Sequence, residues 1–182
     1  MIPKFNKEKE FTDQLIAFEI VQKYILPGLP IQQIKGSMNT KNCINFLAED
    51  KSTVQAIGFG YSFRPEYRQF PIRLGKPVGR ECTWEKLTAL YLDNGFMPNL
   101  MVQGVFKRNS WDLAACAMVD TRVIIRFMLE HRSLCSEKPN RDPNDNWIIF
   151  SPDWYTLMDK FHMDLIVFDT EKHQETKHHS FF

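Results

Sequence analysis

The chain has 182 residues, enough for one domain with a hydrophobic core. Its 23 lysine and arginine residues nearly balance its 22 aspartate and glutamate residues, giving a formal net charge of +1. Any contact with nucleic acid must therefore come from a local basic patch rather than from a global field. The four cysteines are far apart and form no Cys-x-x-Cys pair, which favours free thiols in a reducing cytoplasm over a disulfide framework.

Membrane insertion is not expected for this sequence. No apolar run approaches the roughly 20 residues that a transmembrane helix requires, and the N-terminus lacks the apolar segment of a signal peptide. We therefore expect no membrane partner and a cytoplasmic location.

The N-terminal third of the chain predicts a helix followed by a hairpin. Apolar spacing indicates a helix over residues 7–26, ended by Pro27 and Gly28. A short strand over residues 31–35 follows. Two strand-like runs, the first at about residues 42–48, flank a polar turn at residues 49–52 and predict a hairpin.

The second run of this hairpin has an uneven distribution of side-chain size. Large residues alternate along it with small ones: Ile57, Phe59, Tyr61 and Phe63 against Ala56, Gly58, Gly60 and Ser62. Successive side chains of a strand point to opposite faces, so one face is bulky and the other nearly bare. Glycine within a strand marks a bulge or a place where a ligand or another backbone comes close. The bare face is therefore a candidate docking surface.

The remaining elements alternate between strands and helices. We expect strands over residues 69–74, 100–106, 111–119, 147–150 and 165–168, and a mobile loop over residues 133–146. We expect three further helices, with N-caps at Thr83, Asp120 and Ser151 and ends near Gly95, His131 and His162. The predicted fold is one α+β domain over residues 1–170, with a central mixed or antiparallel sheet flanked by helices, and a flexible polar tail over residues 171–182.

Cationic and aromatic side chains cluster around the bend that follows the hairpin and on the third predicted helix. Flexible cations suit phosphate contact, and exposed aromatic rings suit base stacking. The candidate residues for contact with nucleic acid or a partner are Arg64, Tyr67, Arg68, Arg73, Arg122 and Arg126. The alternative, solvated charges beside core aromatics, stays open. Three of the five histidines lie in the polar tail, which argues against a histidine metal site.

The order of elements resembles small phage-encoded proteins of the PD-(D/E)xK nuclease superfamily, over about residues 5–170. One group of these proteins opens with a phenylalanine-rich helix that carries glutamine and glutamate, matched here by Gln14 and Glu19. Its element Tyr-x-x-x-(Tyr)-x-Gln-Phe-x-Ile-Arg is matched by EYRQFPIR at residues 66–73, of which QFPIR is the specific part. WEKL at residues 84–87 falls where the group begins its next helix. The resemblance implies a nuclease-like core.

The residues that carry the superfamily's chemistry are not matched. An active member has an aspartate on the first hairpin strand and Glu/Asp-x-Lys on the second, where the carboxylates hold Mg²⁺. The first strand here offers Asn42, Cys43 or Asn45, and the second offers the segment 58–60, Gly-Phe-Gly. The remaining carboxylates that could serve as metal ligands are Glu19, Glu49 and Asp50. We therefore assign no catalytic residue to the standard motif, no metal site and no cofactor.

These observations suggest a protein that keeps a nuclease-like shape without the standard chemistry. Small phage and mobile-element proteins of this kind often act against host defence. The leading hypothesis is an anti-CRISPR-like inhibitor of a nucleic-acid-guided nuclease in a bacterial host cell. It would bind the effector ribonucleoprotein, or its RNA or DNA, or provoke damage to the guide RNA.

Two alternatives stay open. The first is a Mg²⁺-dependent nuclease with a migrated site built from Glu19, Glu49 or Asp50. The second is a phage accessory protein without enzymatic activity. The target effector, the binding face and the choice between monomer and dimer are left open by the sequence.

Overall fold

Two β-sheets organise the computed structural model, which describes residues 7–50, 53–75, 82–139, 148–172 and 174–176. The larger sheet has seven strands, in the spatial order β1 (Ile31–Gln33), β2 (Phe46–Asp50), β3 (Thr53–Ser62), β5 (Leu100–Phe106), β6 (Leu113–Asp120), β9 (Leu165–Asp169) and β10 (Gln174–Thr176). The smaller sheet has three strands, in the order β4 (Ile72–Gly75), β8 (Ile148–Ser151) and β7 (Ser136–Pro139). The helices are α1 (Lys7–Ile25), α2 (Ser37–Asn42), α3 (Thr83–Leu92), α4 (Thr121–Glu130) and α5 (Trp154–Phe161), with a 3₁₀ turn, η1 (Arg132–Leu134).

The larger sheet is mixed, and its one parallel pair among the described strands lies at its centre. Strand β3 pairs in parallel with β5, with Gly60 opposite Gln103, and the other described pairs of this sheet are antiparallel. The expected α+β class with a mixed sheet flanked by helices is confirmed. The predicted hairpin is also confirmed, since β2 and β3 pair antiparallel.

The first strand of the hairpin begins later than we expected. Residues 37–42 form α2, and the strand starts at Phe46 instead of residue 42. Cys43, which follows α2, has a φ of 59°, a left-handed conformation that ends the helix and redirects the chain into β2. Glu49 and Asp50, expected in the turn, belong to β2.

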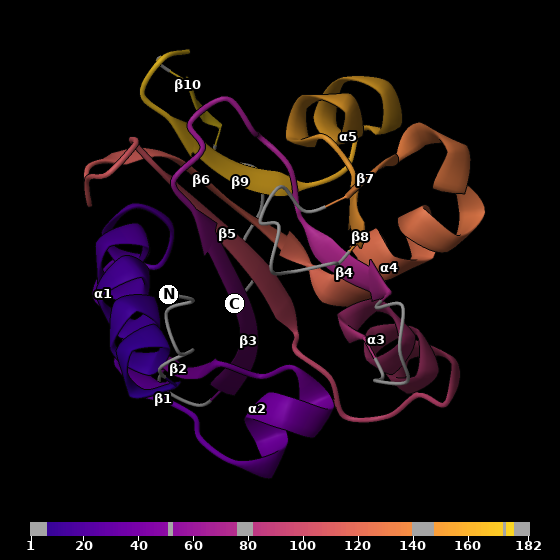
Figure 1. Ribbon diagram of the computed structural model, residues 1–182, viewed down its shortest axis with the longest axis horizontal. Coiled ribbons are helices and arrows are strands. Elements are labelled where there is room, and N and C mark those ends of the chain that lie inside the picture. Colours follow the sequence, from indigo (N-terminus) through magenta and orange to yellow (C-terminus); the bar gives the residue numbers. More distant parts are fainter. Residues whose placement is uncertain (1–6, 51–52, 76–81, 140–147, 173, 177–182) are drawn as a thin grey trace, which may run out of the picture.

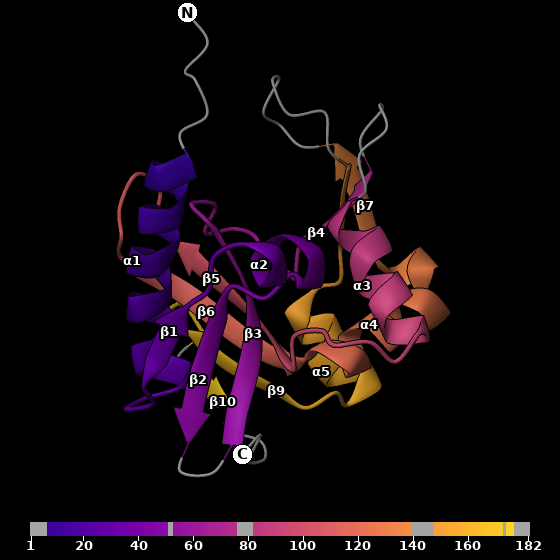
Figure 2. The ribbon, with the colours of Figure 1, turned by 90° about the horizontal axis from the view of Figure 1, so that it is seen from below.

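The bulky face of the larger sheet is covered by α1 (Figures 1 and 2). Phe18 of α1 stacks on Phe46 of β2, with 4.0 Å between ring centroids, and lies edge-on to Phe59 of β3. Val21 and Val102 are buried in the same cluster. The large side chains that alternate along the sequence of β3 therefore pack against α1, and Gly58 and Gly60 face away from it.

The opposite side of the larger sheet faces α3, α4, α5 and the smaller sheet (Figure 2). The core there includes the fully buried Trp154 of α5, whose ring lies 5.7 Å from that of Phe70. Ile72 of β4, Leu87 of α3 and Ile124 of α4 are buried in the same cluster. This packing holds β4 and the loop before it beside the bare face of β3.

Two of the three predicted N-caps are wrong. Helix α3 is capped by Cys82 rather than Thr83, in a capping box with Glu85, and α5 is capped by Asp153 rather than Ser151. Ser151 is instead buried at the end of β8, where its hydroxyl donates to Gln69 Oε1 at 2.9 Å. A thiol cap cannot be anticipated from the usual preference for Ser, Thr, Asp and Asn.

Three further segments differ from the sequence-based predictions. The loop expected over residues 133–146 contains η1 and β7, and residues 140–147 lie outside the described part of the chain. The strand expected over residues 69–74 is shorter, because β4 begins at Ile72, while Gln69 forms a single bridge with Asp153. We expected no element after residue 170, but β10 pairs antiparallel with β9.

The N-cap of α4 at Asp120 is confirmed and leads to a stability prediction. Its carboxylate accepts hydrogen bonds from the backbone N–H groups of Arg122 at 2.8 Å and Val123 at 3.1 Å. Asp120→Ala should lower the free energy of unfolding by about 0.5–2 kcal/mol, because both donors lose their partner. Urea denaturation measures the change. Asp164→Ala, which alters an exposed aspartate outside any helix, is the matched control, and an equal loss in both variants would contradict the capping role.

Candidate functional site

A groove runs along the bare face of β3, between the larger sheet and β4. It consists of two adjoining cavities of about 420 Å³ and 350 Å³. Both cavities are lined by Gly60, Tyr61, Pro71, Arg73 and Gln103, so they form one continuous depression. We call it the β3–β4 groove.

The groove exists because β3 has no side chains on this face at Gly58 and Gly60. A Cβ atom at position 60 would lie 2.5 Å from Gln103 Oε1, and one at position 58 would lie 3.2 Å from Cys43 O. Side chains at these positions would therefore fill the floor of the groove or displace its lining.

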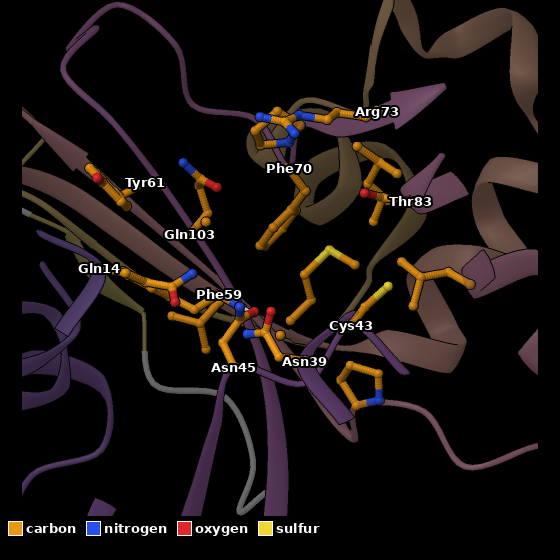
Figure 3. Close-up of a pocket in the computed structure, with 18 of the residues that line it drawn as sticks. Gln14, Asn39, Cys43, Asn45, Phe59, Tyr61, Phe70, Arg73, Thr83 and Gln103 are labelled. Atoms are coloured by element: carbon orange, nitrogen blue, oxygen red, sulfur yellow. Dashed lines mark hydrogen bonds between the residues drawn. The ribbon is translucent and has the colours of Figure 1, made fainter. Parts of the chain in front are cut away.

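The walls of the groove come from segments far apart in the sequence (Figure 3). They are supplied by α1, α2 and the turn after it, the loop before β4, and the start of α3, with the lining side chains Gln14, Asn39, Cys43, Asn45, Phe70, Ile72, Thr83 and Lys86. The second cavity adds side chains from the bend after β3 and from the smaller sheet, namely Arg64, Tyr67, Gln69, Lys138 and Ile149.

The groove lining carries more positive than negative charge. Its cations are Arg64, Arg73, Lys86 and Lys138, whereas Glu10 is the one carboxylate among its described residues. Burial raises the pKa of the Tyr61 phenol, and the nearby carboxylates of Asp13 and Glu10 raise it further, so this phenol stays protonated at neutral pH. The groove can thus attract an anion and offer it hydrogen-bond donors.

Gln103 is a polar side chain buried at the floor of the groove. It is 3% exposed, and its Nε2 donates to the carbonyl oxygen of Gly104 at 3.0 Å. Its Oε1 has no hydrogen-bond partner among the described residues. By contrast, Asn45 serves the fold, because its Oδ1 accepts a hydrogen bond from Phe59 N at 2.7 Å.

Three of the six predicted contact residues, Arg64, Tyr67 and Arg73, line the groove together. Arg73 lines both cavities and lies above the groove floor in Figure 3. Lys138 Nζ lies 5.9 Å from the centroid of the Tyr67 ring, which places a second cation beside this wall. Whether these side chains contact a ligand stays a prediction.

Arg68 is not available as a contact residue. It is 8% exposed, and its guanidinium forms a two-point ion pair with Asp169, with distances of 2.8 Å from Nε and 3.1 Å from Nη2. The phenol of Tyr155 donates to the same carboxylate at 2.5 Å. The sequence shows Arg68 beside Arg64 and Tyr67, but it does not show that its partner lies 101 residues further along the chain.

Asp169 is the centre of this buried network. Burial alone would raise the pKa of its carboxyl, but the hydrogen bonds from Arg68, Tyr155 and the Glu171 N–H outweigh burial and lower it to about 2. Burial and the bond to Asp169 raise the pKa of the Tyr155 phenol. The network ties the bend at residue 68, which forms part of the groove wall, to β9 and α5.

Arg122 and Arg126 lie apart from the groove, on α4. Both line a shallow hollow beside Tyr91, Leu92 and Asn94. Arg122 Nη2 donates to Gly95 O at 3.2 Å, and Arg126 forms an exposed ion pair with Glu130 at 2.9 Å. The structure therefore divides the six predicted contact residues between two surfaces and the buried Arg68 network.

The three candidate metal-binding carboxylates are not gathered into a site by the described residues. Glu19 is exposed on α1 and Glu49 is exposed on β2, while the Asp50 side chain lies outside the described part of the structure. None of the three is among the described residues that line the groove. No group of three or more His, Cys, Asp or Glu residues within the described segments is placed to hold a metal ion.

The sequence-based reasoning missed Gln103, Lys138 and the amides of Gln14 and Asn39 as groove residues. Gln103 carried a signal, since it is the one polar side chain in the apolar strand LMVQGVF. Gln14 was named only for the family resemblance. Lys138 and Asn39 carried no signal, because the elements that place them beside β3 are separate from it in sequence.

Comparison with known proteins gives no family for this chain. No protein-family model matches the sequence, and no curated protein matches it significantly. Within the described helices, none combines the length and apolar character that crossing a membrane requires.

Proposed function

We propose that this protein is a phage or mobile-element inhibitor of a nucleic-acid-guided host defence nuclease, and that the β3–β4 groove contacts the nucleic acid of that effector. The proposal includes a nuclease-like core whose standard metal site has been lost. In that proposed core, β3 is the strand that would carry the catalytic residues, and it has Gly58 and Gly60 in their place.

The observation that carries the proposal is the chemistry of the groove lining. Phosphate binding is favoured by cations on flexible side chains, and four lysines and arginines line the groove beside one carboxylate, Glu10, among its described residues. Tyr67 adds a ring surface of the kind on which bases stack. The near-neutral net charge of the chain does not oppose this, because the cations are concentrated at one place.

The proposed role is tested by cleavage assays with a panel of guided nucleases of the Cas9 type, each loaded with its guide RNA. Target DNA and guide RNA are resolved on separate gels, with and without a molar excess of the protein. We expect at least one effector to lose target cleavage, and Arg64→Ala/Arg73→Ala to restore most of it. Shortening of the guide RNA would identify RNA damage as the route.

Two outcomes would contradict the proposal. Cleavage of DNA or RNA by the protein alone with Mg²⁺, abolished by Glu19→Ala together with Asp50→Ala, would favour a nuclease with a migrated site. Stable self-assembly without binding to any effector or oligonucleotide would favour a phage accessory protein.

A further inference from the structure

We propose that the β3–β4 groove seats a single nucleobase against the side-chain amide of Gln103. The inference deepens the proposed function and rests on it for the class of ligand. It concerns recognition of a base, whereas the cations of the groove concern the phosphate backbone.

The first argument is the state of the Gln103 amide. Gln103 is 3% exposed as a residue, but its Oε1 is not one of the fully buried side-chain atoms that lack a partner in the described part of the chain. Gln103 Nε2 uses one of its two hydrogens on Gly104 O, and Oε1 has no partner among the described residues. The side chain projects into the groove (Figure 3). An acceptor and one donor are thus presented side by side to whatever enters.

The second argument is the shape of the space around this amide. Gly60 lies directly opposite Gln103 on the neighbouring strand and contributes no side chain, so the Gln103 amide itself lies over the Gly60 backbone, where it lines both cavities. The cavity of about 420 Å³ falls within the range of small-molecule sites. The ring of Phe70 forms an apolar wall of this cavity, across from Gln103.

The third argument is chemical complementarity. A primary amide matches a base edge that offers a donor beside an acceptor, as glutamine does with adenine, and such a pair discriminates against bases that lack this edge. A phosphate offers only acceptors, so it cannot satisfy Gln103 Oε1. Arg73 lines both cavities and Arg64 lines the second, which places cations where a phosphate attached to a seated nucleoside can reach them.

The test compares the 5′-monophosphates of adenosine, cytidine, guanosine and uridine with ribose 5-phosphate, which lacks only the base. Binding to the full chain is measured by isothermal titration calorimetry. We expect at least one nucleotide to bind about tenfold or more tightly than ribose 5-phosphate. Gln103→Leu should reduce that ratio to near one, with thermal unfolding checked in parallel.

A second variant probes the same seat without removing the amide. Gly60→Ala places a Cβ 2.5 Å from Gln103 Oε1, and the amide, at the end of a flexible side chain, must turn away. We expect this variant to keep its melting temperature and to lose the preference for the nucleotide over ribose 5-phosphate.

A wild-type protein that binds all five ligands equally, or variants that keep the preference, would overturn the proposal. If the protein inhibits an effector but shows no base preference, the proposed nucleobase site is refuted and the proposed function stands. If it prefers a base but inhibits no effector, only the proposed function is refuted.

Discussion

Asp169→Asn should lower the free energy of unfolding by roughly 3–5 kcal/mol, the range measured when one partner of a buried ion pair is removed. The substitution leaves the Arg68 guanidinium, whose side chain is 9% exposed, without its carboxylate, and it weakens the bond from Tyr155. Arg68 Nη1 already lacks a partner among the described residues, so little compensation is at hand. Chemical denaturation at pH 7 measures the loss.

Glu171→Gln is the matched control for this variant. Glu171 approaches the same guanidinium at 3.4 Å, but its side chain is 71% exposed, and exposed ion pairs contribute about 0–1 kcal/mol. If both substitutions cost the same, burial is not what gives the Arg68–Asp169 pair its stability contribution.

The effect of Asp169→Asn should also depend on pH. The pKa of Asp169 is about 2 in the folded protein, below its usual value of about 3.9 in unfolded chains. The ionised carboxylate therefore stabilises the fold fully above about pH 4, and this stabilisation is lost as the pH falls toward 2. The difference between wild type and variant should be largest at about pH 5–7 and should shrink below about pH 4. A difference that grows on acidification would contradict the assignment.

Arg64→Ala/Arg73→Ala should weaken binding of single-stranded RNA at least tenfold. Removing one phosphate contact makes the slope of log K against log salt shallower by about 0.7 for a single strand, so the double variant should change it by roughly 1.4. Fluorescence anisotropy with a labelled 12-nucleotide RNA, at four salt concentrations, gives both quantities.

Arg122→Ala/Arg126→Ala is the matched control, since it also removes two positive charges, but from α4. We expect it to change affinity less than threefold, because neither arginine lines the groove. Equal losses in the two double variants would indicate a nonspecific charge effect. A larger loss in the α4 variant would move the binding surface to the hollow beside Tyr91.

Local patterns in the sequence predicted most of the fold. The alternation along β3, the paired runs of β5 and β6, and the capping aspartate of α4 each specify structure within a short stretch of chain, and all three are confirmed. The errors occur where tertiary contacts decide. Cys82 caps α3 because its thiol is held in place, donating to Leu74 O at 2.8 Å, and no propensity scale includes that contact.

The candidate site was less predictable than the fold. The bare face of β3 was visible from the spacing of its glycines, but the wall opposite it comes from β4 and α3, whose positions depend on packing around Phe70, Leu87 and Trp154. Arg68 and Arg73 look equivalent in sequence. Only the fold shows that Arg68 is buried against β9 and that Arg73 faces the groove.

Photo-crosslinking tests the groove most directly. The full chain is saturated with a 12-nucleotide RNA carrying 4-thiouridine, irradiated and digested, and the crosslinked peptides are identified by mass spectrometry. A nucleic-acid-binding groove predicts crosslinks within residues 60–73 and at the segment around Gln103, which should disappear in Arg64→Ala/Arg73→Ala. Crosslinks confined to residues 121–130, or none at saturating RNA, would contradict the assignment of the β3–β4 groove as the nucleic-acid site.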